Sequence, residues 1–493
     1  MNFREIYYEQ KEVEVLLIQP NIMKKRNSET LVDKYFKNNN SEYLIADSVT
    51  EYNWGLLYIG KYLLENNHSV QVLDFNYYDY CKRSKFNSEI TIEDIEGILK
   101  NKKAKYIGIS CMTVGMKQSL EIAKLCKLLF PEAIICLGGI HVNYYWNEIL
   151  NLYEFVDVVI LGEGEIVFNQ LVESDKNSWK EIHGIAYSKD GYIYQNPPIK
   201  YNVNEFSRPA YELVPNDMVL VPRIYLSRGC VGTCKYCSVS TFYSNECRYR
   251  KVEQVIQELK YVINHHNVKA YMMGDLSFGQ NKKVTMDLCA AIISNGLNHI
   301  YWWCQMRICD IDEELLDIMY EAGCRQIGIG IEADEKEVLD NVSANKKNKS
   351  VKEICEIILK RNIQVQGYFI IGLPSDTSNT ILNNIAQIEN LLKNGLITFP
   401  HISITIPYPG TALYEEAESF GIEIVEKDFS KYFMNCDAEN CGLPVFNSIE
   451  LSRYQIYALW QLALATAIKY VKIPSVKYIN QKDFQYNPVK IKV

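Results

Sequence analysis

The chain has 493 residues, 48% hydrophobic and 23% charged, with a net charge of −8. This length exceeds one hydrophobic core and predicts two or three domains, and the acidic balance argues against a nucleic-acid partner, whose phosphates need a basic surface. The sequence has no signal-peptide core and no run of about 20 apolar residues that could span a membrane, so we expect a cytoplasmic protein whose 15 cysteines are thiols or metal ligands rather than disulfides.

The first third of the chain alternates predicted strands and helices. Near-continuous apolar, β-branched runs between helical patterns are typical of a parallel sheet covered on both faces. The pattern predicts an α/β, doubly wound domain, which binds ligands beyond the carboxyl ends of its strands. The expected strands are 13–20, 69–74, 106–110, 133–138 and 156–161, and the expected helices are 55–66, 92–101, 117–130 and one that begins near residue 165.

Glycines follow two of these strands, as Gly-Gly-Ile-His at 138–141 and Gly-Glu-Gly-Glu at 162–165. Glycine lets the backbone approach a flat ligand closely. The order and spacing of these segments resemble the cobalamin-binding domain that precedes many radical S-adenosylmethionine (SAM) enzymes. The resemblance implies a Rossmann-like cobalamin-binding domain over 1–175, and a relic that keeps this fold without the cofactor is the alternative. The residues that it implies at cobalamin are Ser110, Gly138, Gly139, His141, Gly162 and Glu163.

The segment 176–222 is predicted to be a hairpin followed by a linker. Asp190-Gly191 lies between two β-rich runs and is a strong signal for a tight hairpin turn. Pro197 and Pro198 then end the second run.

Three cysteines follow the next predicted strand, with three and then two residues between them: Cys230, Cys234 and Cys237. A 4Fe–4S cluster normally takes four thiolates, so three would leave one iron open to another ligand. A zinc site usually needs four ligands in two pairs, and no matching pair follows closely. The spacing resembles the signature of the radical SAM superfamily, whose open iron binds SAM and whose electron releases a 5′-deoxyadenosyl radical.

From residue 223 onward, strands and helices again alternate, and six such units predict a partial (β/α)6 barrel over 223–420 with its chemistry at the carboxyl ends of the strands. Segments at these ends resemble the SAM-binding motifs of the family, although Met273-Gly274-Asp275 departs from the usual glycine-rich form. By this resemblance, Asp275 accepts the SAM amino group, while Arg307 and Glu332 serve its carboxylate and ribose. The residues that the resemblance implies at SAM are Tyr236, Gly274, Asp275, Arg307 and Glu332.

The last segment, 421–493, is expected to be mostly helical, with an apolar helix over 456–468 that packs on the core. Cys436 and Cys441 lie in a polar loop; we interpret them as loop thiols, with an auxiliary cluster as the alternative.

The resemblance, which covers about residues 13–415, implies a class B-like methyltransferase with three cofactors, namely a 4Fe–4S cluster, SAM and cobalamin. It implies methylation of an unactivated carbon or phosphorus through methylcobalamin and the 5′-deoxyadenosyl radical. Radical cyclisation, carbon–carbon coupling or oxidation without methyl transfer is the alternative. The implied partners are a small-molecule, lipid or peptide substrate and a low-potential electron donor such as flavodoxin or ferredoxin.

Overall fold

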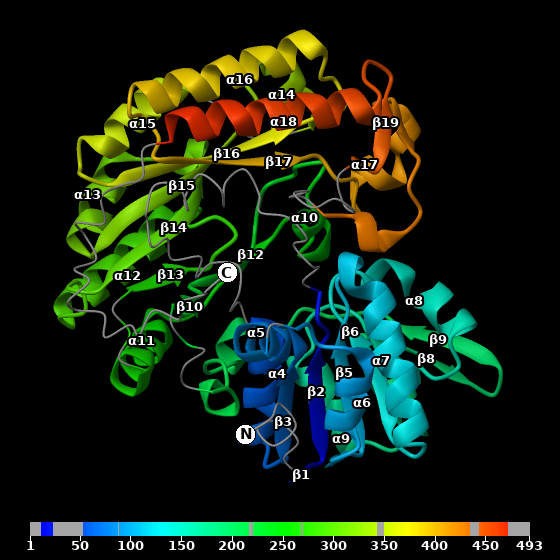
Figure 1. The fold of residues 1–493 in the computed structure, drawn as a ribbon. Coiled ribbons are helices and arrows are strands. Elements are labelled where there is room, and N and C mark those ends of the chain that lie inside the picture. The colour runs from blue at the N-terminus through cyan, green and yellow to red at the C-terminus, as the bar shows by residue number, and fades with distance from the viewer. Residues whose placement is uncertain are drawn as a thin grey trace. The chain divides into compact units, whose positions relative to one another are not determined.

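The computed structural model describes residues 11–22, 53–86, 88–215, 219, 221–266, 268, 270–342, 350–433 and 443–471. These residues fall into two compact units, one up to residue 219 and the other from 221 to 471. Each unit contains a large, mainly parallel sheet of its own (Figure 1).

The first unit is built on a seven-stranded sheet in the order β3-β2-β5-β6-β7-β8-β9. The first five of these strands are parallel, and their residues are mostly buried. The chain reverses its direction of travel across the sheet between β2 and β5, which are hydrogen-bonded neighbours. The strands of this unit are β1 Lys11–Glu12, β2 Val15–Gln19, β3 Val70–Asp74, β4 Lys102–Lys103, β5 Tyr106–Ser110, β6 Ile134–Gly138, β7 Val158–Ile160, β8 Ile185–Lys189 and β9 Tyr192–Asn196.

Helices cover both faces of this sheet, as the sequence predicts. One core cluster joins the sheet to α6, α7 and α8, and a second joins its other face to α4 and α9. The doubly wound fold is therefore confirmed. Local signals place the helix starts: Asn53 caps α4, and Thr91 and Asp94 form a capping box on α6. The helices are α4 Trp54–Glu65, α5 Phe75–Phe86, α6 Ile92–Leu99, α7 Met116–Leu129, α8 Val142–Leu152 and α9 Glu165–Glu173.

The hairpin predicted between the two domains is part of the first sheet. Strand β8 pairs with β7 in the antiparallel direction, and β9 pairs with β8. Ile185, Ala186 and Tyr187 of β8 are buried. These apolar side chains can be buried only against the sheet, so the hairpin extends the sheet instead of standing apart.

The second unit contains six parallel strands in the order β10-β13-β14-β15-β16-β17. Consecutive strands are neighbours, and helices follow them along one side of the sheet, as in a partial (β/α) barrel (Figure 1). A small antiparallel pair, β11 with β12, stands beside the first strand. The strands are β10 Arg223–Ile224, β11 Ser227–Gly229, β12 Cys247–Tyr249, β13 Ala270–Met273, β14 Tyr301–Arg307, β15 Cys324–Glu332, β16 Gln364–Ile371 and β17 Phe399–Ile404.

The helices of the second unit agree closely with the predicted ones. The sequence pattern predicts helices over 252–265, 283–295 and 312–322, and α11, α12 and α13 begin and end within one residue of these bounds. The helices are α10 Ser238–Phe242, α11 Val252–His266, α12 Lys282–Ser294, α13 Glu313–Glu321, α14 Lys336–Val342, α15 Val351–Leu359, α16 Ser378–Lys393, α17 Ala412–Glu415 and α18 Arg453–Tyr470.

The C-terminal segment adds the small sheet of β18 (Ile422–Ile424) and β19 (Phe446–Ser448) and the helix α18. Helix α18 packs on α16 and β17, and its Trp460 donates an indole hydrogen bond to the Ile402 carbonyl at 2.9 Å. The packing role predicted for this apolar helix is what the structure shows. Cys436 and Cys441 lie outside the described residues.

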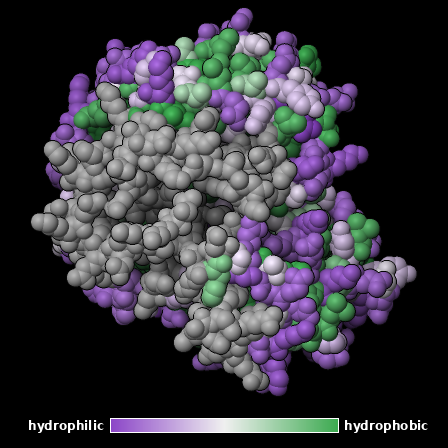
Figure 2. Space-filling model, in the orientation of Figure 1, coloured by the Kyte–Doolittle hydropathy of each residue, from purple (hydrophilic) through white to green (hydrophobic). Residues whose placement is uncertain are grey.

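The surface carries a mixture of residue types. On the face drawn in Figure 2, the coloured residues alternate between hydrophilic and hydrophobic patches. Among the described residues, we find no helix with the length and hydropathy needed to span a membrane.

Candidate functional site

The cysteine loop of the second unit joins β11 to α10 and holds three half-buried thiols. The Gly232 N–H donates a hydrogen bond to Cys230 Sγ at 3.3 Å. A Cβ on Gly232 would lie 3.3 Å from Cys230 Sγ and 3.8 Å from Cys234 Sγ, so both sulfurs surround one point. Burial raises the pKa of Cys230, and the nearby Cys234 and Cys237 raise it further. Cys230 and Cys234 thus flank Gly232, and Cys237 lies near enough to Cys230 to affect its pKa.

In the part of the chain that the structure describes, no three His, Cys, Asp or Glu side chains are gathered tightly enough to hold one metal ion. Ligation of a cluster by the three thiols of this loop therefore stays a prediction.

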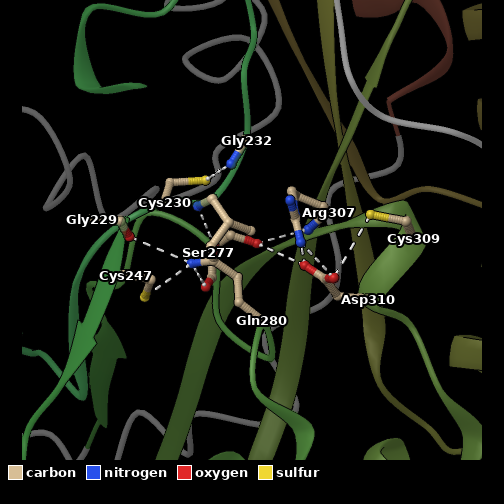
Figure 3. A network of polar contacts seen from close by, with 10 residues as sticks. Gly229, Cys230, Gly232, Cys247, Ser277, Gln280, Arg307, Cys309 and Asp310 are labelled. Carbon is tan, nitrogen blue, oxygen red and sulfur yellow. Dashed lines mark hydrogen bonds and ion pairs between the residues drawn. The ribbon is translucent and has the colours of Figure 1, made fainter. Parts of the chain in front are cut away.

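The side-chain amide of Gln280 is one of the groups that tie the cysteine loop to the barrel (Figure 3). Its Oε1 accepts a hydrogen bond from the Val231 N–H at 2.8 Å, and its Nε2 donates to the Ser277 carbonyl at 2.9 Å. The same Nε2 lies 3.5 Å from the Gly229 carbonyl and 3.6 Å from Cys247 Sγ. The sequence analysis missed Gln280, whose one signal is its place in the loop that follows β13.

Asp275 is buried, and both of its carboxylate oxygens contact the chain that leads into the cysteine loop. The Leu226 N–H donates to it at 3.0 Å and the Ser227 hydroxyl at 2.5 Å. Burial raises its pKa to about 6, while these two donors oppose that rise. Next to it, Gly274 leaves room for the ring of Tyr225, which a Cβ would approach to 2.7 Å. Asp275 thus supports the cysteine loop, and its contact with the SAM amino group stays a prediction.

Arg307 ends β14 with its guanidinium held by a neighbouring carboxylate. Its Nε and Nη2 donate to the two oxygens of Asp310 at 2.7 and 2.8 Å, and its backbone N–H donates to Ser277 Oγ (Figure 3). Its charge lowers the pKa of Cys230, opposing the larger effect of burial, so it faces the cysteine loop. This pair uses one edge of the guanidinium and leaves the Nη1 edge for a second carboxylate, such as that of SAM.

Glu332, the last residue of β15, has a strained backbone. Its φ is +64°, and the Ala333 N–H donates to the Ile331 carbonyl at 2.9 Å across it, which makes a γ-turn of the rare, positive-φ kind. Asn384 of α16 holds the Glu332 carbonyl at 3.3 Å. Such strain in a non-glycine residue is concentrated at functional sites.

The side chain of Glu332 turns toward the other predicted SAM residues. Its Oε1 lies 2.6 Å from the place where a Cβ of Gly330 would be. The pKa of Tyr236 is raised well above its usual value, first by burial and then by the charge of Glu332 and by Cys234. The structure thus brings Tyr236, Glu332 and the cysteine loop together.

In the first unit, polar residues gather where β2 and β5 end, at the point where the strand order reverses. Asn53 Nδ2 donates to Gln19 Oε1 at 2.7 Å and to Ser110 Oγ at 2.6 Å, and Asn53 Oδ1 caps α4. Ligands of doubly wound sheets bind in this crevice. Ser110 therefore lies where the sequence predicted, and Gln19 and Asn53 are additional residues that it did not predict.

The three predicted glycines of this unit have different reasons to be glycine. Gly139 has a φ of +116°, and a Cβ there would lie 2.8 Å from the Cys111 carbonyl, so the protein itself excludes a side chain. Gly162 has a φ of +79°. At Gly138, by contrast, the nearest atom to an added Cβ is 3.9 Å away. Only Gly138, among these three, has an ordinary backbone and open space beside it, which fits a close ligand.

Asn143 joins the loops that carry these glycines. Its Nδ2 donates to the Gly139 carbonyl at 2.8 Å, and its Oδ1 accepts from the Gly162 N–H at 2.6 Å. The half-buried Glu163 follows in the second loop. Asn143 therefore connects the loops that follow β6 and β7. The glycines in the sequence did not predict this connection.

His141 is buried, and both ring nitrogens have protein neighbours. Nδ1 lies 3.2 Å from Thr113 Oγ1 and Nε2 lies 3.0 Å from Met116 Sδ, while the ring stacks on Tyr145. Burial lowers its pKa to about 4. A bond from His141 to cobalt would have to replace one of these contacts. His141 therefore has a packing role in the protein, and its contact with cobalamin stays a prediction.

Family comparisons agree with both sites. The model of the Radical SAM superfamily matches residues 224–408, and that of the B12 binding domain matches residues 47–172. An uncharacterized methyltransferase of Pyrococcus horikoshii is 28% identical over 372 residues, which cover 74% of this chain and 78% of that protein. The anaerobic magnesium-protoporphyrin IX monomethyl ester cyclase of Rubrivivax gelatinosus is 24% identical over 70% of this chain and 63% of its own length, so the chain spans less than two thirds of the cyclase.

A solved structure shares the fold. The radical SAM methyltransferase TsrM of Kitasatospora setae, with tryptophan and a SAM analogue bound, superimposes with a TM-score of 0.63 at 15% identity, over 90% of this chain and 88% of that one. A further structure of TsrM contains cobalamin and a 4Fe–4S cluster. The chain therefore contains a B12 binding domain followed by a radical SAM domain, the pair of domains found in cobalamin-dependent radical SAM enzymes.

Proposed function

We propose that this enzyme methylates an unactivated carbon, or phosphorus, of its substrate. The observation that carries the proposal is the pairing, in one chain, of a three-cysteine loop beside Glu332 and Arg307 with a B12-type crevice at Ser110 and Gly138. When bound, SAM and the cluster supply a radical and cobalamin supplies a methyl carrier, and the protein supplies position and exclusion of water.

The protein's own residues divide this work. Cys230, Cys234 and Cys237 hold the cluster, and Gln280 fixes the loop that carries them. The Nη1 edge of Arg307 takes the SAM carboxylate, and Glu332 takes the ribose hydroxyls. A carboxylate accepts two hydroxyl donors well, and a guanidinium edge matches a carboxylate. A low-potential donor such as flavodoxin or ferredoxin supplies electrons.

In the first unit, Ser110, the open backbone at Gly138 and the nearby Gly162 contact cobalamin. The connection made by Asn143 keeps these backbone groups in place. His141 keeps its contacts with Thr113 and Met116, and its predicted contact with cobalamin is made beside them.

A second candidate is radical cyclisation without methyl transfer. The cyclase relative from Rubrivivax gelatinosus covers 70% of the chain at 24% identity, and its name states a ring closure. The two candidates differ in one product, because methyl transfer converts SAM into S-adenosylhomocysteine, whereas radical formation yields 5′-deoxyadenosine.

The test is a product analysis on the full chain. The protein is purified without oxygen, loaded with cluster and cobalamin, and given SAM and a low-potential reductant. Methyl transfer predicts S-adenosylhomocysteine as well as 5′-deoxyadenosine, with the former lost when cobalamin is omitted. A cobalamin-loaded protein that forms 5′-deoxyadenosine alone contradicts methylation and favours the second candidate. The variant with all three loop cysteines changed to Ala is the control that should form neither.

A further inference from the structure

One face of the barrel sheet carries polar side chains with almost no charge. Along β14 to β17, alternate residues are buried and mostly apolar, as they are in Val365, Phe369 and Ile371 of β16, and helices lie along that side of the sheet (Figure 1). Successive residues of a strand point to opposite faces. The half-buried residues between them therefore form the other face. Besides Tyr301, Gln364 and Phe399 at the starts of their strands, it contains Trp303, Gln305, Arg307, Gln326, Gly330, Glu332, Gln366, Tyr368, Ile370, His401 and Ser403.

Charge is confined to one end of this face. Among the residues just named, Arg307 and Glu332 are the charged ones, and both end their strands. Arg307 is already paired with Asp310. The remaining polar groups are amides, hydroxyls and aromatic nitrogens, which bind neutral partners and leave an added charge without a counter-ion.

Tyr368 and His401 form a rigid aromatic pair on this face. Their rings stack at 4.7 Å and 6°. Gln305 Nε2 donates to the Tyr368 hydroxyl at 2.8 Å, and the Tyr368 ring covers Gly328, where a Cβ would lie 2.5 Å from it. The pair therefore depends on a glycine in the neighbouring strand.

An amide chain fixes which nitrogen of His401 carries the proton. Gln326 Nε2 donates to Gln366 Oε1 at 3.1 Å, and Gln366 Nε2 donates to His401 Nε2 at 2.5 Å. Because His401 Nε2 accepts, its ring hydrogen is on Nδ1. Burial lowers the pKa of His401 to about 4, so the ring is neutral near pH 7. Nδ1 has no hydrogen-bond partner among the residues that the structure describes, which leaves one oriented donor on the wall.

The strand register places His401 in one row with Arg307, which is predicted to bind SAM. Arg307 pairs with Gly330, Gly330 with Tyr368, and Tyr368 with His401. Three strand spacings of about 4.8 Å separate Arg307 from His401, so the row is about 14 Å long. Gly330 has no side chain in the middle of the row, and the Glu332 carboxylate reaches over it, with Oε1 2.6 Å from where a Cβ would lie. A group that packs against the aromatic pair would therefore lie next to this carboxylate, which disfavours a second negative charge there.

We propose that His401, Tyr368 and Gln366 form a substrate-binding wall that selects an uncharged planar group with a carbonyl acceptor, such as an amide. The carbonyl accepts from His401 Nδ1–H, and the plane of the group packs against the stacked rings. This inference rests on the proposed function, because it names the part of the substrate that enters the barrel.

The test uses two probes of the same shape that differ in charge, benzamide and benzoate. Binding to the full-length, cluster-loaded protein with SAM is followed by saturation-transfer NMR. We expect benzamide to bind at millimolar concentration and benzoate at least tenfold more weakly. Loss of one neutral hydrogen bond predicts about fivefold weaker benzamide binding in His401→Phe, which keeps an aromatic ring. SAM affinity should be unchanged.

The control is His265→Ala, on the exposed side of α11. It should leave benzamide binding intact. If His401→Phe does not fold, His401→Gln replaces it, because glutamine keeps a donor of similar reach and should bind benzamide better than His401→Ala. Equal binding of benzoate, absence of benzamide binding, or folded variants with unchanged benzamide affinity would overturn the proposal. The readout is binding, so failure of methyl transfer is seen separately as missing S-adenosylhomocysteine.

Discussion

The strained backbone at Glu332 allows a test that separates strain from ligand contact. Two substitutions, Glu332→Gly and Glu332→Ala, both remove the carboxylate proposed to hold the SAM ribose. They differ in the backbone, because glycine adopts the observed φ of +64° without cost, whereas alanine keeps the strain. A left-handed conformation costs a non-glycine residue about 1 kcal/mol or more. The lost backbone freedom of glycine opposes part of that gain.

We therefore expect Glu332→Gly to be more stable than Glu332→Ala by about 1 kcal/mol, or about 2–4 °C in thermal midpoint for a unit of this size. Both variants should bind SAM at least tenfold more weakly, since losing one partner of a buried, charge-assisted contact costs about 2–5 kcal/mol. Thermal unfolding and equilibrium dialysis with SAM, both without oxygen, measure the two effects.

The matched control is Asn362→Gly, in the turn after α15, where φ is +55°. It should relieve local strain and leave SAM binding unchanged. If Glu332→Gly kept the wild-type SAM affinity, the residue would be a backbone feature and not a ligand. If the two Glu332 variants were equally stable, the γ-turn would store no strain.

Three further predictions follow from the two sites. In Gln280→Ala, the cluster should bleach in air several times faster than in the wild type, as measured by optical absorbance, because the loop loses one of its ties to the barrel. Equal rates would mean that Gln280 does not hold the loop. Gly138→Phe should lose cobalamin while the protein stays folded. Gly139→Ala should instead lower the thermal midpoint, because its Cβ meets the Cys111 carbonyl. Retention of cobalamin by a folded Gly138→Phe would mean that this glycine is not part of the cofactor site. Burial lowers the pKa of His141 to about 4, so the unfolded chain binds a proton at a higher pH than the folded chain does. Protonation of this residue should therefore cost up to about 3 kcal/mol of folding stability as the pH falls from 6.5 to 4. His141→Asn should flatten that part of the pH dependence of thermal unfolding, and an unchanged slope would contradict a buried, neutral His141.

The sequence was sufficient to predict features that are encoded locally. The strands before Gly138 and before Cys230 stand out because apolar runs end at glycine or cysteine, and their order along the chain fixes the parallel topology. The cysteine spacing alone identified the loop. The expected helix 92–101 came from its hydrophobic pattern, and the structure adds the capping box of Thr91 and Asp94 at its start.

The residues that hold these sites in place could not be predicted in the same way. Asn53, Gln280 and Asn384 are amides in ordinary loops or helices, and each contacts a site residue 49 to 57 positions away in the chain. Nothing in the local pattern distinguishes them from solvent-exposed amides. Asp275 shows the opposite case, because a motif suggested a ligand contact and the structure reveals that its two oxygens also support the loop.

An open barrel has a last strand, and here that strand is β17. A free strand edge invites pairing with another chain, and therefore aggregation. Helix α18 lies against β17, and the indole N–H of Trp460 donates a hydrogen bond to the Ile402 carbonyl of that strand. The radical SAM family match ends at residue 408, well before this helix. A chain shortened to that boundary would lose its edge protection, so protein production for structural work should retain the sequence through at least residue 471.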